Sequence, residues 1–120
     1  MAIDGFSDAE MHLVQATLHE RYGRAVTVED VEVEVRLHPA DRELVACPAL
    51  YWKEEGCDYV VSKTGANRYR SMFFFGRIKD RYTSHPDEYH EYDNLGDCLI
   101  LTLKVQEEVA RQRARESAGA

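Results

Sequence analysis

The sequence predicts an α+β fold in which two helices pack on one face of a four-stranded antiparallel sheet. Helical periodicity occurs near each end of the 120-residue chain, and strand-like segments separated by turn residues fill the region between them. The expected order is therefore helix, four strands, helix. The length predicts one domain over residues 1–120, because domains commonly contain on the order of 100–150 residues.

The first helix is predicted within residues 7–23, SDAEMHLVQATLHERYG. Ser7 and Glu10 form an S-x-x-E capping box, in which each side chain accepts a hydrogen bond from the backbone N–H of the other residue. Glycine readily follows the last turn of a helix, so Gly23 marks the expected end. The apolar positions fall on one helical face: Met11, Val14, Leu18 and Tyr22.

Four strands are predicted between residues 28 and 78. In residues 31–37 apolar residues alternate with charged ones, which is typical of a half-buried strand with a charged outer face. Residues 43–52, 57–63 and 68–78 are the other three strands, and the short turns KEEGC and KTGANR join them as a meander. Pro48 places the second strand at a sheet edge or at a bulge, because proline has no N–H to donate.

The last helix is predicted from about Leu95 to Arg115, after a polar, tyrosine-rich loop over residues 82–94. Asn94 or Asp93 is the candidate N-cap. Three arginines lie near the other end, where the helix dipole favours positive charge. The tail at about 116–120 is expected to fray.

The turns also predict which residues share a face of the sheet, because side chains alternate with a period of two. A short turn after Trp52 pairs Trp52 with Tyr59. An even-length turn after Lys63 pairs Tyr59 with Met72, which places Met72 and Phe74 under the helices and Phe73 on the second face. An odd-length turn exchanges these two faces.

The second sheet face is predicted to bind a protein partner, because two helices cover only one face. Exposed apolar patches mark interaction sites, and aromatic residues and arginine are enriched at interface hot spots. The alternative is that the C-terminal helix or the 82–94 loop covers this face within the chain. The predicted partner-binding residues are Tyr51, Arg68, Tyr69, Arg70, Phe73, Phe75 and Arg77.

The net charge of −7 is unevenly distributed. Residues 1–61 hold thirteen acidic and five basic residues. Residues 62–81 hold one acidic and six basic residues, and residues 82–97 hold five acidic residues and no basic one. Nucleic-acid affinity depends on clustered cations, so an acidic chain of this size disfavours a nucleic-acid partner. The basic segment 62–81 is expected either to meet a partner or to pair with the acidic segment that follows it.

The cysteine pattern predicts reduced, buried thiols. Cys47, Cys57 and Cys98 are odd in number and form no C-x-x-C pair, which argues against a disulfide framework and a thiolate zinc site. The sequence contains no apolar run long enough for a membrane helix and no pattern of a signal peptide. A cytoplasmic location without membrane association is the expectation.

The segment HPDEYHEYD is the densest group of potential metal ligands, and His85 and His90 are its weak metal candidates. Their His-x4-His spacing matches no established metal motif, so a solvated acidic loop is the preferred interpretation. The chain also lacks a nucleophile elbow, a glycine-rich phosphate loop and a Cys-His catalytic signature. No cofactor is expected.

The leading hypothesis is a non-enzymatic accessory protein that binds a specific protein partner through the aromatic sheet face and forms a homodimer. In layout this small acidic helix–strands–helix chain resembles secretion chaperones and related small chaperones, a resemblance that implies dimerisation and partner segments held on a sheet. One alternative is a small enzyme or metal-dependent sensor that uses His85, His90 and nearby carboxylates. Another is an acidic inhibitor or immunity-type protein, whose Glu32 and Glu34 would meet a basic target.

Overall fold

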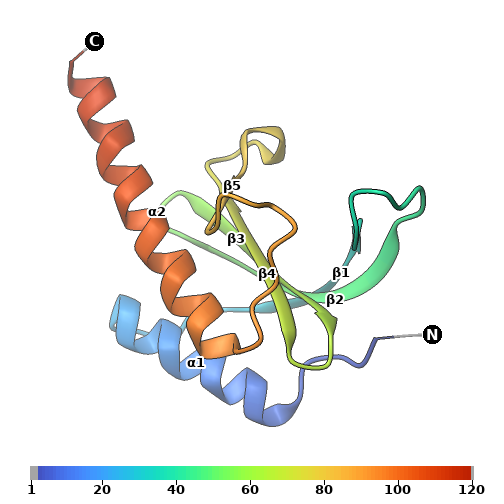
Figure 1. Ribbon diagram of the computed structural model, residues 1–120. Coiled ribbons are helices and arrows are strands. Elements are labelled where there is room, and N and C mark those ends of the chain that lie inside the picture. Colours follow the sequence, from blue (N-terminus) through green and yellow to red (C-terminus); the bar gives the residue numbers. More distant parts are fainter. Residues whose placement is uncertain (1–2, 120) are drawn as a thin grey trace.

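A computed structural model describes residues 3–119 and shows two helices and a five-stranded antiparallel sheet. The strands lie side by side in chain order (Figure 1). The elements are α1 (Asp8–Tyr22), β1 (Glu29–Val35), β2 (Val45–Glu54), β3 (Cys57–Gly65), β4 (Arg68–Phe74), the 3-10 turn η1 (Ile78–Asp80), β5 (Tyr82–Thr83) and α2 (Leu95–Ala118). The α+β class is confirmed. The predicted number of strands is wrong, because Tyr82 and Thr83 leave the expected loop to pair with β4.

The first helix has the predicted ends. The Ser7 hydroxyl accepts a hydrogen bond from the Glu10 N–H (3.1 Å), and the Glu10 carboxylate accepts one from the Ser7 N–H (2.8 Å). Gly23 has a φ of 70°, the left-handed conformation that glycine adopts most readily, and its N–H donates to the carbonyl of His19. The capping box and the helix end are therefore confirmed.

The second helix begins as predicted and ends later. Asn94 is the N-cap, and its side-chain oxygen accepts a hydrogen bond from the Asp97 N–H (3.0 Å). The helix continues to Ala118, three residues beyond the predicted end. Its C-terminal half is largely exposed and projects past the sheet (Figure 1). The predicted frayed tail includes residue 120, which lies outside the described residues.

One sheet face and the two helices enclose the hydrophobic core. Trp52 stacks on Tyr59 across β2 and β3, with ring centroids 5.1 Å apart, and Phe73 stacks on Tyr82 at 5.3 Å. The helices contribute Val14 and Leu18 from α1 and Leu95, Cys98, Leu99 and Leu103 from α2. Tyr82 is half-buried and the other side chains are buried, so this face is the main core of the domain.

The β2–β3 register is confirmed, since Trp52 is paired with Tyr59. The β3–β4 register is not the predicted one. Lys63 is paired with Tyr69 and Gly65 with Arg68, which leaves Thr64 as an extra residue in β3. Such a β-bulge shifts the pairing by one residue and exchanges the faces of the partner strand.

The bulge reverses the predicted faces of β4. Tyr69 and Phe73 face the helices, and the exposed fractions of these side chains are 3% and 0%. Phe75 packs against the same core, with the Arg113 guanidinium 4.3 Å from its ring centroid. Met72 and Phe74 therefore lie on the opposite face, and both are half-buried.

Candidate functional site

The second sheet face is also apolar, and we call it the open face because both helices lie against the other side of the sheet (Figure 1). The pairing of Val33 with Cys47 places the three β1 valines on this face. Asp30, Glu32 and Glu34 consequently lie on the helix side, beyond the reach of the core, and Glu29, paired with Tyr51, lies at the end of the open face. The open face carries Val31, Val33, Val35, Val45, Cys47, Ala49, Tyr51, Val60, Met72 and Phe74.

The middle of the open face is closely packed. Cys47 and Ala49 have no exposed surface, and Val60 is 6% exposed, because larger neighbours cover these small residues. The larger side chains at the margins, including Met72 and Phe74, are half-buried. The face is therefore a preformed apolar floor with accessible edges.

A groove of about 400 Å³ lies at one end of the open face, between the end of the β1–β2 hairpin and residues 78–89. Figure 1 shows both of these segments rising on the same side of the sheet. Cavities of roughly 300–1,000 Å³ are typical of binding sites in proteins. The apolar lining is Val33, Val35, Leu44, Met72 and Ile78, and the polar lining is Glu34, Arg36, Ser62, Arg70, Ser71, Arg81, Thr83, Glu88 and Tyr89.

Arg70 connects the two walls of the groove. Its guanidinium donates hydrogen bonds to the carbonyls of Arg36 (2.8 Å) and Leu37 (2.6 Å), which lie just beyond β1. The same group lies 3.3 Å from the Glu91 carboxylate and 5.5 Å from the ring centroid of Tyr89, both in the segment before α2. Arginine suits this position because its planar fork of donors serves several acceptors at once.

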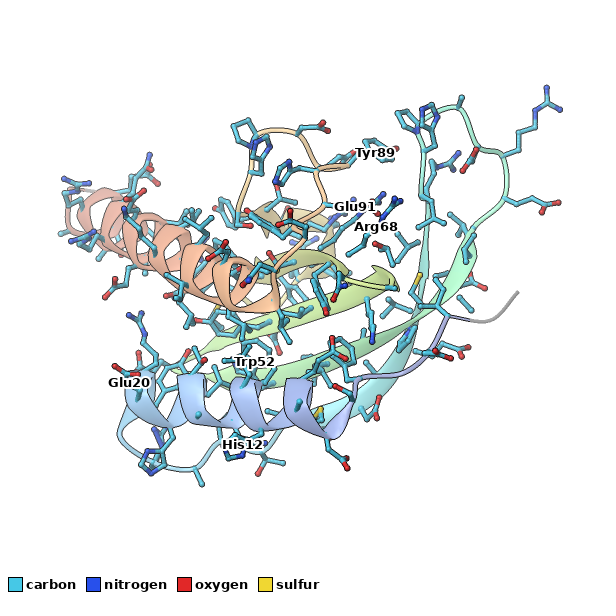
Figure 2. The ribbon with its side chains drawn as sticks, turned by 60° about the horizontal axis from the view of Figure 1, so that its bottom comes forward. His12, Glu20, Trp52, Arg68, Tyr89 and Glu91 are labelled. Atoms are coloured by element: carbon cyan, nitrogen blue, oxygen red, sulfur yellow. The ribbon has the colours of Figure 1, made fainter. Side chains whose placement is uncertain are left out.

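Figure 2 shows Arg68, Tyr89 and Glu91 gathered in one region, at the opposite side of the molecule from His12 and Glu20 of α1. Arg68 is the outer member of this group. Its guanidinium is 3.9 Å from Glu91, and its side chain is 68% exposed, against 11% for Arg70. Glu91 is thus held mainly by the buried arginine.

The basic segment 62–81 is mostly neutralised within the chain. Ion pairs join Lys63 to Glu10, Arg68 and Arg70 to Glu91, and Arg77 to Asp80. Within residues 3–119, Lys79 and Arg81 are the two bases of this segment for which no ion pair is found. Both border a second hollow of about 350 Å³ that shares Arg81, Thr83 and Glu88 with the groove.

The polar members of the open face are largely satisfied. The Tyr51 hydroxyl donates a hydrogen bond to the buried carboxylate of Asp58. This hydrogen bond raises the pKa of Tyr51 to about 12, with burial and the Asp58 charge adding to the effect. Tyr51 therefore remains an uncharged phenol that is fixed in place at the edge of the face.

The two predicted metal candidates lie together, but their geometry suits stacking. The rings of His85 and His90 are 3.9 Å apart and inclined by only 11°. Nitrogen lone pairs of parallel stacked rings do not converge on one ion about 2 Å from each. The Nδ1 of His85 also accepts a hydrogen bond from the Asp87 N–H (3.0 Å). Within residues 3–119 there is no group of three or more potential metal ligands.

The three thiols are buried and free, which agrees with the prediction of reduced cysteines. Burial raises the pKa of all three thiols. The pKa of Cys57 rises to about 11 and that of Cys98 to about 12. Thiols in this state are poor nucleophiles, since the thiolate is the reactive form. Cys47 belongs to the apolar floor rather than to reactive chemistry.

Of the predicted partner-binding residues, the structure leaves Tyr51, Arg68 and Arg70 on the open face or its margin. Arg77 lies in the turn after β4, and its exposed side chain pairs with Asp80. The sequence interpretation missed Met72 and Phe74 as members of the open face, and Lys79 and Arg81 as the free cations. The available signal was the turn KTGANR, whose odd-length alternative leads to the observed faces.

Comparison of the chain with protein-family models, with curated proteins and with solved structures finds no match in any of the three. No helix among residues 3–119 is long and apolar enough to cross a membrane. The fold and the groove define this chain as a small α+β protein with helices on one sheet face and a preformed groove on the other.

Proposed function

We propose that this chain is a non-enzymatic binding protein that holds an apolar segment of a protein partner on its open face, seated in the groove. The observation that carries this proposal is an apolar sheet face with a buried floor and half-buried edges that neither helix covers. Apolar patches of this kind, rimmed by polar groups, mark interaction sites on small soluble proteins.

The energetics favour a partner of this kind. Complete burial of Met72 and Phe74 would contribute roughly 1.5–3 kcal/mol for each side chain, less the fraction already buried. The Arg70 hydrogen bonds hold the groove walls in place before binding, so little conformational freedom remains to be lost there. An extended segment suits the elongated shape of a sheet face better than a folded surface does.

The proposal is tested with the double variant Met72→Ser, Phe74→Ser. Its matched control is Ile100→Ser, Leu101→Ser, which removes two exposed apolar residues from α2, on the other side of the sheet. Each protein is isolated at native level, its fold is checked by near-UV circular dichroism, and its bound proteins are quantified by mass spectrometry. We expect the open-face variant to lose a partner that the wild type and the α2 variant retain. Equal recovery from all three would contradict the proposal.

A further inference from the structure

The groove has a charged end as well as an apolar lining. Lys79 and Arg81 are exposed, and no ion pair is found for either within residues 3–119, whereas the other four bases of segment 62–81 are paired. Both lie in the connection from β4 to β5, where Arg81 lines the groove and the second hollow and Lys79 lines the second hollow. Glu88 is the one acidic residue that lines both hollows in the described chain, and Asp80, between the two bases, is paired with Arg77.

This local excess of positive charge contrasts with a chain whose net charge is −7. Residues 1–61 are strongly acidic, so an acidic partner approaching at random is repelled by most of the molecule. The end of the groove bordered by Lys79 and Arg81 is an exception. Such an arrangement favours one orientation of a partner that carries a localised negative charge.

We propose that the partner segment is apolar with a carboxylate-bearing end, and that its carboxylates lie against Lys79 and Arg81 while its apolar side chains contact Met72 and Val33. This inference rests on the proposed function, because it specifies the chemistry of the segment that the same groove binds. A lysine and an arginine next to an apolar lining discriminate against basic and uncharged segments through charge, and against purely polar acidic segments through the lost apolar contact.

Three synthetic peptides test the inference: acetyl-Leu-Val-Ala-Leu-Asp-Glu-amide, the same peptide ending in Asn-Gln-amide, and the same peptide ending in Lys-Lys-amide. Methyl-labelled methionine provides the reporter, since Met72 lines the groove and Met11 lies on α1. Affinities are measured by titrating each peptide and following the Met72 methyl resonance in NMR spectra. We expect the acidic peptide to bind about three- to tenfold more tightly than the Asn-Gln peptide at low salt. The preference falls as the salt concentration rises.

The variant Lys79→Gln, Arg81→Gln is expected to abolish the preference for the acidic peptide, so that the acidic and Asn-Gln peptides bind this variant with equal affinity. The matched control is Lys104→Gln, Arg111→Gln, which removes one exposed lysine and one exposed arginine from α2 and should keep the preference. Equal affinities for the acidic and Asn-Gln peptides, or a preference that survives in the first variant, would overturn the carboxylate inference and leave the proposed function standing. If none of the peptides shifts the Met72 resonance, both proposals are wrong.

Discussion

The Glu10 carboxylate lies 2.8 Å from the Lys63 ammonium, and this ion pair joins the first turn of α1 to β3. The same carboxylate accepts hydrogen bonds from the Ser7 N–H and the Tyr69 hydroxyl. Lys63 also donates to the carbonyl of Gly5 (3.1 Å), and its side chain is only 10% exposed. One glutamate therefore completes the helix cap, neutralises a nearly buried lysine and satisfies a core tyrosine.

Glu10→Ala is expected to destabilise the protein by about 3 kcal/mol, because it leaves a buried lysine without its counter-charge. Glu10→Gln retains one acceptor oxygen, which serves the cap, and places an amide NH2 next to the Tyr69 hydroxyl, which can accept from it, so we expect a smaller loss of about 1–2 kcal/mol. Urea unfolding monitored by circular dichroism measures both values. Glu20→Ala, an exposed substitution on the same helix, is the control and should change stability by less than about 0.5 kcal/mol. Equal stability of the Glu10→Ala and Glu20→Ala proteins would contradict the assigned role.

The pKa of Glu10 predicts a specific loss of stability in acid. Burial alone would raise this pKa, but hydrogen bonds from Lys63, Ser7 and Tyr69 and the Lys63 charge lower it to about 2. A lowered folded-state pKa stabilises the native protein above the unfolded-state value of about 4.3, and the stabilisation is lost as the pH falls towards 2. We expect a contribution of roughly 1–2 kcal/mol at pH 7 after allowance for solvent screening.

The measurement compares the wild type with Glu10→Gln by urea unfolding at several pH values between 7 and 2. The comparison cancels the effect of the other carboxyl groups on acid stability. The difference in unfolding free energy should be constant from pH 7 to about 5 and should shrink below that. A difference that stays constant down to pH 2 would show that the charge of Glu10 contributes nothing.

Local patterns predicted the helices and one register correctly because their causes are local. The Ser7–Glu10 box and Gly23 set the ends of α1, and a short turn sets the β2–β3 pairing. The β3–β4 register depends instead on contacts distant in sequence. Lys63 and Tyr69 reach Glu10 across separations of 53 and 59 residues, and Tyr69 lies on the side of Glu10 in the register that contains the bulge at Thr64. The turn KTGANR permits both an even-length and an odd-length connection, and its local sequence does not select between them.

The candidate site could be predicted from the sequence only where its cause lies within a single strand. Apolar residues on both faces of the strands correctly indicated a second apolar face, because period-two alternation is a property of each strand. The groove itself depends on Arg70 meeting the carbonyl of Arg36, which lies 34 residues earlier. Its charged end depends on which bases find acids, and only the folded chain shows that Lys79 and Arg81 find none within residues 3–119.

Arg70→Lys is expected to loosen the hairpin at residues 36–44. A lysine provides one ammonium in place of the fork that serves the carbonyls of Arg36 and Leu37 and the Glu91 carboxylate. Hydrogen exchange measured by mass spectrometry should be faster in that hairpin, and global stability should fall by about 1–2 kcal/mol. Arg68→Lys is the matched control, since its 3.9 Å contact with Glu91 is exposed. Unchanged exchange in the Arg70→Lys protein would show that Arg70 does not hold the walls of the groove together.

Deletion of Thr64 tests whether the bulge residue itself is needed for the observed β3–β4 register. Gly65 is paired with Arg68 and Lys63 with Tyr69, so removal of the extra residue between them leaves a regular hairpin in which Phe73 still faces the helices. We expect the deletion to reduce stability in urea unfolding by less than about 2 kcal/mol, because every buried aromatic residue keeps its site. Thr64→Val keeps the extra backbone residue and changes only its side chain. It therefore separates the effect of the side chain from the effect of the bulge. Its hydroxyl is buried without a hydrogen-bond partner in the described structure, so this substitution should be neutral or slightly stabilising. A loss of more than about 3 kcal/mol in the deletion protein, the size expected when a buried aromatic residue leaves its site, would show that the bulge residue is needed for the observed faces of β4.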